Sequence, residues 1–219
     1  MLSVYNLHLH EEVVMLALHE TRGTLPGTGA EAFAVSGGML SELLLARRIR
    51  LEPVKRKVLV RVTDERLTGD HLVDECFERI RKSTKVRTVN TWISLFAQDR
   101  GRTARIINRL YMAGIMRREE RSVLWLFTRH VYPLQSKEAK RRIVERLRAA
   151  VIDGSTPDPR TRALLGLSVQ SGLVGNSFSK AELKLHKERI ASLIAGDPIV
   201  AAVREARGQA HAAMHATPG

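Results

Sequence analysis

Three arginines in the middle of the chain, Arg102, Arg105 and Arg109, have the spacing of one helical face. Separations of three and four residues bring side chains to the same side of a helix, and Arg100 falls in the turn before its N-terminus. Guanidinium groups bind phosphate through paired N–H donors, and the free backbone N–H groups at a helix N-terminus also attract anions. The pattern therefore predicts a surface that binds phosphate groups.

The wider segment around these arginines is strongly basic. Residues 100–148 contain 14 Lys and Arg residues against 4 Asp and Glu, a net charge of +10, whereas the whole chain of 219 residues carries +13. A second basic face is expected on the following helix, at Lys137, Lys140, Arg141 and Arg148. Runs of Lys and Arg often form only a solvated surface. So few interspersed acids nevertheless favour a polyanionic partner.

Other reactive side chains do not form a catalytic pattern. His8, His10, Glu11 and Glu12 cluster without the spacing of a zinc motif, and no further ligand follows at metal-binding spacing. Cys76 lies on the apolar side of a predicted helix and is expected to be a small buried hydrophobe. The glycine pairs match neither a dinucleotide-binding motif nor a phosphate-binding loop. We therefore expect no enzymatic activity, no metal and no cofactor.

Composition indicates a folded domain without a membrane span. Hydrophobic residues make up 44% of the chain and charged residues 27%, which is enough for a sizeable core. A single cysteine excludes an intrachain disulfide, and no secretory signal is visible. The longest apolar run, 13–18, is far below the roughly 20 residues of a spanning helix. We expect the protein in the cytoplasm, either dissolved or lying on a membrane surface.

Hydrophobic periodicity predicts one mainly α domain with a little β structure. Helices are expected over residues 8–20, 30–48, 69–83, 88–98, 103–113 and 137–151, followed by three more before a frayed tail. Alternation over 58–62 predicts a strand, and the apolar runs 115–116 and 123–127 predict a β-hairpin. Gly37 and Gly38 lie inside the second helix, where each costs about 1 kcal/mol relative to Ala, so we expect another helix to pack closely there.

Two kinds of polyanion fit this organisation. The order of a helix at 88–98, an arginine-bearing helix at 102–113 and a hairpin is that of a winged-helix unit, which would bind nucleic acid. Alternatively, the same arginines would meet lipid phosphates on a membrane, where each basic residue contributes about 1 kcal/mol. The residue pattern alone does not separate these alternatives.

Several sequence blocks resemble the Golgi phosphoprotein 3 family, including its bacterial members. They are LHLHEEVVMLAL at 7–18, GGMLSELLLARRIRL at 37–51, and GIM, LWLF and PL between 114 and 134; the similarity extends from about residue 7 to 203. The resemblance implies a compact single helical domain over residues 7–205 with a projecting β-hairpin, followed by a frayed tail at 206–219. It implies a non-enzymatic peripheral membrane adaptor, because eukaryotic members bind phosphatidylinositol 4-phosphate and hold glycosyltransferases in the Golgi. Anionic membrane lipids and client membrane proteins are thereby favoured over nucleic acid as partners.

The resemblance also assigns site residues. Eukaryotic members hold the head group with a loop tryptophan, an arginine before the Met-Leu helix and two arginines near the start of the central helix. In this chain those positions fall on Gly27, Ser36, Arg100 and Thr103. The expected lipid-phosphate site therefore consists of Arg100, Arg102, Arg105, Ser36 and Gly27.

The family's hairpin implies a homo-oligomer. Here Val123, Leu124, Trp125, Leu126 and Phe127 would expose apolar area on such a projection unless the strands fold back onto the core. An oligomer formed through this hairpin would multiply weak lipid contacts by avidity.

Overall fold

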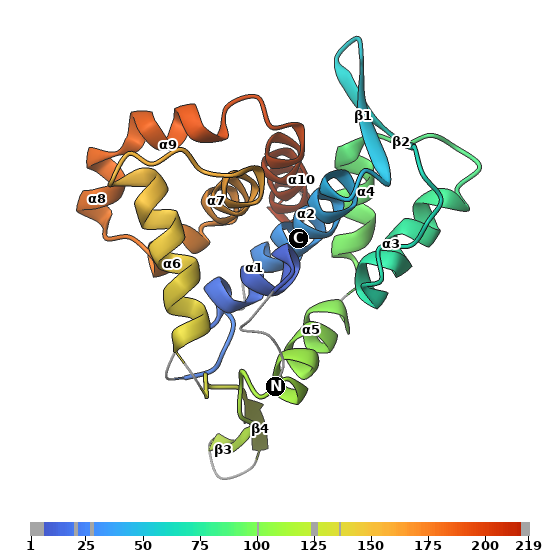
Figure 1. Cartoon of the computed structure of the whole chain (residues 1–219). Helices are drawn as coiled ribbons and strands as arrows, with labels where there is room; N and C mark the ends of the chain where they lie inside the picture. The colour runs from blue at the N-terminus through green and yellow to red at the C-terminus, as the bar shows by residue number, and fades with distance from the viewer. Residues whose placement is uncertain are drawn as a thin grey trace.

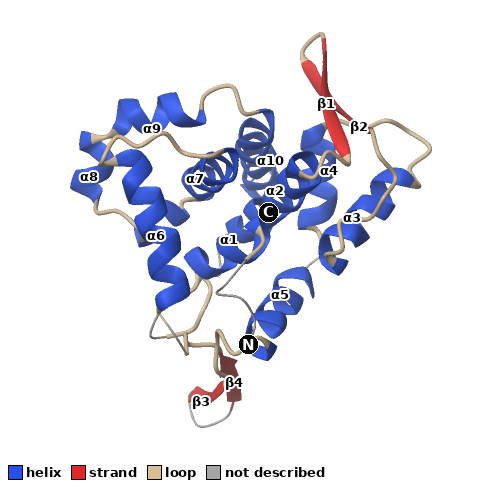
Figure 2. Cartoon of the chain, in the orientation of Figure 1, coloured by secondary structure: helices blue, strands red, loops and turns tan. Residues whose placement is uncertain are grey.

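The computed structural model describes residues 7–19, 22–26, 29–99, 101–123, 127–135 and 137–215 and confirms a mainly α fold (Figures 1 and 2). Within these ranges, ten α-helices and one 3₁₀ turn combine with two antiparallel hairpins. The helices are α1 (Leu9–Ala17), α2 (Ala30–Leu45), α3 (His71–Arg81), α4 (Val89–Ala97), α5 (Gly101–Met112), α6 (Glu138–Val151), α7 (Pro159–Ser171), α8 (Lys180–Leu185), α9 (Lys187–Ile194) and α10 (Pro198–His215), with the 3₁₀ turn η1 at Leu173–Asn176. The strands are β1 (Ile49–Val54), β2 (Lys57–Val62), β3 (Glu119–Val123) and β4 (Phe127–Val131).

Helix α2 lies in the middle of the fold, and α1, α3, α4, α7 and α10 pack around it (Figure 1). The side chains of Met39, Leu40 and Leu43 on this helix are completely buried. Burial of each such side chain contributes about 1.5–3 kcal/mol. The core that supports every other element is therefore built around α2.

Gly37 and Gly38 allow other helices to approach α2 closely, as the sequence predicts. A Cβ atom on Gly37 would lie 2.5 Å from Leu167 Cδ2 of α7 and 2.7 Å from Val203 Cγ2 of α10. A Cβ atom on Gly38 would lie 3.1 Å from the backbone nitrogen of His10 in α1. This close packing offsets the low helix propensity of the two glycines.

The first hairpin, formed by β1 and β2, stands away from the helical body (Figure 1). Its strands pair from Ile49 opposite Val62 to Val54 opposite Lys57. The sequence predicts β2 but not β1, because the turn between them contains neither Gly nor Asn, the residues typical of a two-residue hairpin turn. Instead, Lys55 adopts a left-handed backbone conformation with a φ of 54°.

The second hairpin has the predicted place in the chain but different strand boundaries. Residues 119–123 pair with residues 127–131, so three of the charged residues between the two predicted apolar runs, Glu119, Glu120 and Arg121, lie in β3 rather than in the turn. A two-stranded ribbon has open edges, and charged side chains in it can remain in solvent. Of the residues expected to form oligomer contacts, Leu124, Trp125 and Leu126 lie outside the described residues, as do the side chains of Val123 and Phe127.

The C-terminal helix α10 continues to His215, although a frayed tail is predicted from residue 206. Ala206 is buried, and Gln209 accepts a hydrogen bond from Asn90 of α4 at 3.4 Å. Alanine has the highest helix propensity, so the small residues that suggested fraying in fact favour the helix. The segment after α6 also contains four α-helices rather than the three predicted.

Candidate lipid-phosphate site

Arg102 is buried at the start of α5. Its side chain is 3% exposed, one guanidinium nitrogen donates to the carbonyl of Phe96, and another lies 3.1 Å from the Asp99 carboxylate. The guanidinium also lies over the Phe96 ring, 5.4 Å from its centroid. The prediction that Arg102 shares an exposed face with Arg105 is therefore wrong. Arg102 instead connects the start of α5 to the end of α4 through these contacts.

Arg105 and Arg109 lie on the more open side of α5 and pair with carboxylates of other helices. Arg105 is 2.6 Å from Glu75 of α3, and this hydrogen bond raises the pKa of the guanidinium. Arg109 is 3.0 Å from Glu11 of α1 and also pairs with the buried Asp70, which caps α3. The side chains of the two arginines are 42% and 39% exposed, so solvent reaches both of them.

A surface depression of about 510 Å³ lies beside these two arginines, between α3 and α5. It is lined by His71, Leu72, Ala104, Arg105, Asn108 and Arg109. No carboxylate is among these lining residues, although Glu75 lies close behind Arg105. An anionic group from solvent can reach Arg105 here.

The other expected site residues are not brought together with Arg105. Ser36 is 1% exposed, and its hydroxyl donates to the carbonyl of Ala32 at 2.7 Å. Ser36 therefore has no access to a head group in solvent. Gly27 and Arg100 lie outside the described residues. Among the expected residues that the structure describes, Arg105 is the one exposed cation.

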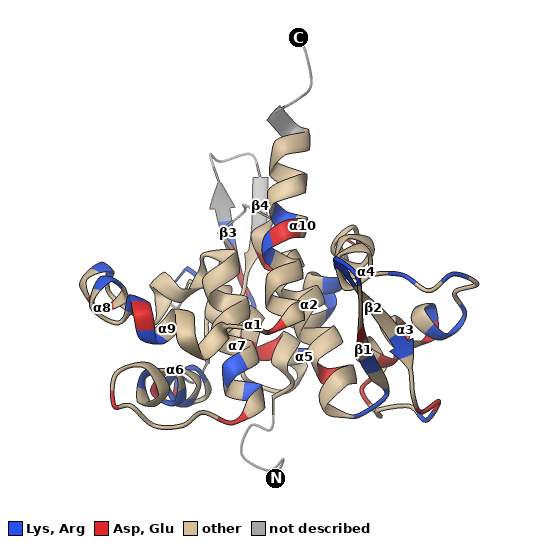
Figure 3. Ribbon diagram, turned by 90° about the horizontal axis from the view of Figure 1, so that it is seen from above, with Lys and Arg blue, Asp and Glu red and all other residues tan. Residues whose placement is uncertain are grey.

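The charge of +10 in residues 100–148 does not form an uncompensated basic surface. The arginines of this segment that pair with carboxylates are Arg102, Arg105, Arg109, Arg117, Arg121, Arg141, Arg142, Arg146 and Arg148. Several of the carboxylates come from other segments, such as Glu12 and Glu182. Figure 3 shows Lys and Arg spread over α3, α6, α8 and the β1–β2 hairpin, with acidic residues among them. Charge counted along the sequence therefore overstates the charge of the folded surface.

The second predicted basic face, on α6, is also only partly exposed. Lys140 is 3% exposed, and its Nζ donates to the carbonyl of Leu18 at 2.8 Å. Arg141 is exposed and pairs with Glu138, while Arg148 crosses to α8. The prediction of a continuous basic face is wrong at Lys140, because that residue occupies the buried side of the helix.

Three consecutive cations at the tip of the β1–β2 hairpin form an exposed group that the sequence analysis missed. Lys55, Arg56 and Lys57 are exposed, and their side chains make no ion pair or hydrogen bond with the described part of the chain. Val54, next to them, is 39% exposed. The available signal was the run VKRK directly after Pro53, which identifies a charged, exposed turn once both strands are assigned.

The single cysteine of the chain, Cys76, is not placed as a nucleophile. Cys76 is completely buried, as predicted, and burial raises the pKa of its thiol to about 11. The thiol is therefore protonated near neutral pH and inert. Within the described ranges, no three His, Cys, Asp or Glu side chains are grouped as ligands of a metal ion would be.

The arrangement of α5 also bears on the winged-helix alternative. A recognition helix presents its arginines outward to the DNA groove. Here Arg102 is buried, and Arg109 pairs with Glu11 and Asp70. The structure therefore does not support DNA binding through this helix.

Comparison with known proteins agrees with the sequence blocks. The family model of Golgi phosphoprotein 3 matches residues 9–210. The chain belongs to the Golgi phosphoprotein 3 family. Vacuolar protein sorting-associated protein 74 of Schizosaccharomyces pombe is 29% identical over an alignment of 170 residues, and the alignment covers 67% of this chain and 50% of that protein. The Golgi phosphoprotein 3 family member described here thus spans about half the length of this curated relative.

None of its helices, within the described residues, is both long enough and apolar enough to cross a membrane.

Proposed function

We propose that this protein is a non-enzymatic peripheral membrane protein that binds anionic phospholipid head groups and acts as an adaptor for membrane proteins. Its family membership supports this proposal. The observation that carries it is the position of Arg105, an exposed cation at a surface depression whose lining contains no carboxylate. Arg100, one residue before α5, is proposed to add a second cation to the same contact.

The ion pairs of Arg105 do not prevent phosphate binding. Its partners Glu75 and Asp99 are themselves 32% and 34% exposed, and exposed ion pairs contribute at most about 1 kcal/mol. A lipid phosphate offers the guanidinium two oxygens for a bidentate pair of hydrogen bonds. Arg102 has a supporting role in this proposal, because it fixes the start of α5 and so the position of Arg105.

Co-sedimentation with vesicles tests the proposed function. At low salt we expect the protein to bind vesicles that contain phosphatidylglycerol or phosphatidylinositol 4-phosphate and to ignore neutral phosphatidylcholine vesicles. Arg105→Gln should weaken binding about fivefold, which corresponds to about 1 kcal/mol for one cation. Arg162→Gln, which removes an exposed charge on α7, is the matched control. Failure of the wild-type protein to bind any anionic vesicle would exclude the function.

We also propose a homo-oligomer formed through residues 123–127. An oligomer would present several copies of the Arg105 contact to one membrane and so raise its avidity. Light scattering over a range of concentrations tests this, since Trp125→Ser should lower the average mass. A mass equal to that of one chain at every concentration would contradict it.

A further inference from the structure

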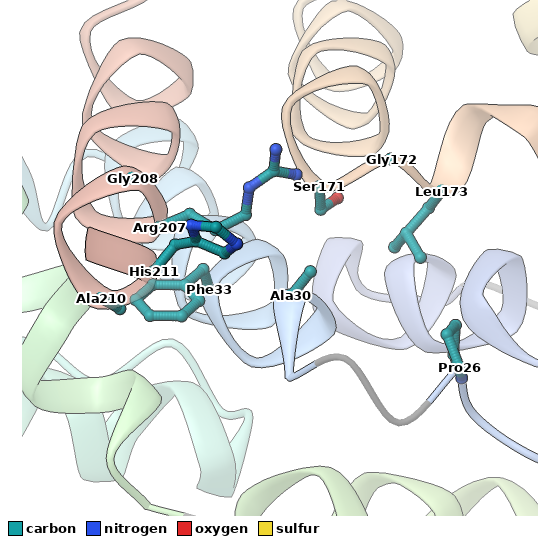
Figure 4. A pocket seen from close by; sticks show the side chains of 10 residues that line it. All are labelled: Pro26, Ala30, Phe33, Ser171, Gly172, Leu173, Arg207, Gly208, Ala210 and His211. Carbon is teal, nitrogen blue, oxygen red and sulfur yellow. The ribbon is translucent and has the colours of Figure 1, made fainter. Parts of the chain in front are cut away.

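A cavity of about 600 Å³ lies between the start of α2, the end of α7 and the end of α10 (Figure 4). This volume is within the range of about 300–1,000 Å³ that is usual for sites of small molecules. Apolar side chains of three elements line it, including Phe33 of α2, Leu173 of η1 and Ala210 of α10. Of the residues expected to bind lipid phosphate, the described ones, Ser36, Arg102 and Arg105, do not line this cavity, and it shares no lining residue with the depression at Arg105.

The charged and titratable side chains at the cavity are basic. They are Arg207 and His211, both from α10, and no carboxylate is among the described lining residues. Arg207 makes no ion pair or hydrogen bond with the described part of the chain, and it is partly buried. In Figure 4 its guanidinium extends over the cavity toward Ser171 at the end of α7. A guanidinium without a carboxylate partner, held beside apolar walls, is suited to an anion that carries an apolar chain.

We infer that this cavity binds a single anionic phospholipid, with the phosphate at Arg207 and His211 and the first part of the acyl region against Phe33 and Leu173. The inference rests on the proposed function for the class of ligand, and it adds a second lipid contact on a different part of the fold. The two contacts have different chemistry. The depression at Arg105 offers mainly charge to a head group, whereas this cavity offers a charge and an apolar wall together.

Two glycines leave the cavity open. Gly172 ends α7 with a left-handed φ of 76°, and Gly208 lies within α10. A Cβ atom on Gly208 would meet no atom within 4 Å. Because Gly208 lines the cavity and its Cβ position is open, we expect a larger side chain there to enter the cavity. Because Gly is the weakest helix former apart from Pro, such a substitution also favours the helix.

Calorimetric titration with dihexanoyl phosphatidylglycerol, below its micelle concentration, tests the inference directly. Arg207→Gln removes the cation, and Gly208→Leu fills the cavity while the helix is retained. We expect each variant to weaken binding at least about tenfold, Arg207→Gln because a charge-assisted contact is lost and Gly208→Leu because the acyl region is excluded. Arg204→Gln removes an exposed charge one turn earlier on α10, outside this cavity, and should bind like the wild-type protein. A thermal melt of each variant confirms that it is folded.

Three results would overturn the inference. The first is wild-type affinity in both Arg207→Gln and Gly208→Leu. The second is equal affinity for dihexanoyl phosphatidylcholine, which would show that the negative charge is not recognised. The third is full displacement of the lipid by inorganic phosphate at the same concentration, because the site would then bind free phosphate. If one of these results is obtained but the protein still binds anionic vesicles through Arg105, the cavity is not a lipid site and the proposed function stands. If the wild-type protein ignores vesicles, the proposed function fails, and the short-chain lipid alone decides whether the cavity is a site.

Discussion

The imidazole rings of His8 and His10 stack with their centroids 5.5 Å apart and their planes at 16°, yet their pKa values shift in opposite directions. The Glu42 carboxylate, 3.6 Å from His8 Nδ1, raises the pKa of His8 against the opposing effect of burial, and Asp70 at 3.3 Å adds to the increase. Complete burial lowers the pKa of His10 to about 4. The surroundings of the stack therefore favour the charged form of His8 and the neutral form of His10.

Stability should depend on pH on both sides of about 6.5, the pKa of an unperturbed histidine. As the pH rises from 6.5 through the raised pKa of His8, the folded state holds a proton that the unfolded state has lost, so the free energy of unfolding falls. As the pH falls from 6.5 toward 4, the unfolded state binds a proton at His10 that the folded state does not, so the free energy of unfolding falls again. Urea unfolding between pH 5 and pH 8.5 measures both slopes.

Two variants separate these contributions. His8→Gln should flatten the decrease above pH 6.5, and His10→Leu should flatten the decrease below it. His10→Leu should also cost little near pH 7, because both ring nitrogens of His10 are buried without a hydrogen-bond partner and replacing such a group by an apolar one is often nearly neutral. An unchanged pH profile in either variant would contradict the assignment.

Lys140 should contribute to stability rather than to binding. Its buried ammonium donates to the carbonyl of Leu18 at 2.8 Å and links α6 to the end of α1. Lys140→Ala leaves that carbonyl without this donor, which costs about 1–3 kcal/mol. Arg142→Ala on the same helix removes an exposed ion pair with Glu138 and should change the free energy of unfolding by less than about 1 kcal/mol. Equal effects in denaturant unfolding would count against this distinction.

Gly37 and Gly208 should respond oppositely to the same substitution. Gly37→Ala forces a Cβ atom to within 2.5 Å of Leu167 and 2.7 Å of Val203, both of which are buried. Overpacking of this kind costs about 1–3 kcal/mol, more than the helix propensity gained. Gly208→Ala meets open space and should stabilise the protein by up to about 1 kcal/mol. Thermal unfolding of the two variants measures the difference, and a stable Gly37→Ala would show that α7 and α10 can move apart.

The helices could be predicted from the sequence because their apolar residues recur at local, regular spacing. The close packing at Gly37 and Gly38 could also be predicted, because glycine lowers the stability of a helix and tight contacts with other helices offset this loss. The candidate site could not be predicted in the same way. Helical spacing places Arg102 and Arg105 near each other, but it does not show that Phe96 and Asp99 bury the first of them. Such contacts depend on how separate elements pack.

The charge of the surface depends on tertiary structure for the same reason. Three glutamates outside residues 100–148 neutralise arginines of that segment. Glu11 and Glu12 lie about 90 residues before it, and Glu182 lies after it. In contrast, Lys55, Arg56 and Lys57 lie at the tip of a projecting hairpin, where their side chains make no ion pair with the described residues. A charge count along the chain therefore overestimates the exposed charge of residues 100–148 and overlooks that of residues 55–57.

Removal of paired and unpaired cations should separate these two groups by stability. Arg109→Gln leaves the carboxylates of Glu11 and Asp70, 4% and 0% exposed, without their arginine, and removal of one partner from a buried pair costs about 3–5 kcal/mol. Because the Arg109 side chain is itself 39% exposed, we expect a loss near or below the lower end of that range. The triple variant Lys55→Gln, Arg56→Gln and Lys57→Gln removes three charges but no contact within the described fold, and should stay within about 0.5 kcal/mol of the wild-type protein. Urea unfolding at neutral pH compares them, and a triple variant as unstable as Arg109→Gln would mean that the hairpin tip is held by contacts to the rest of the chain.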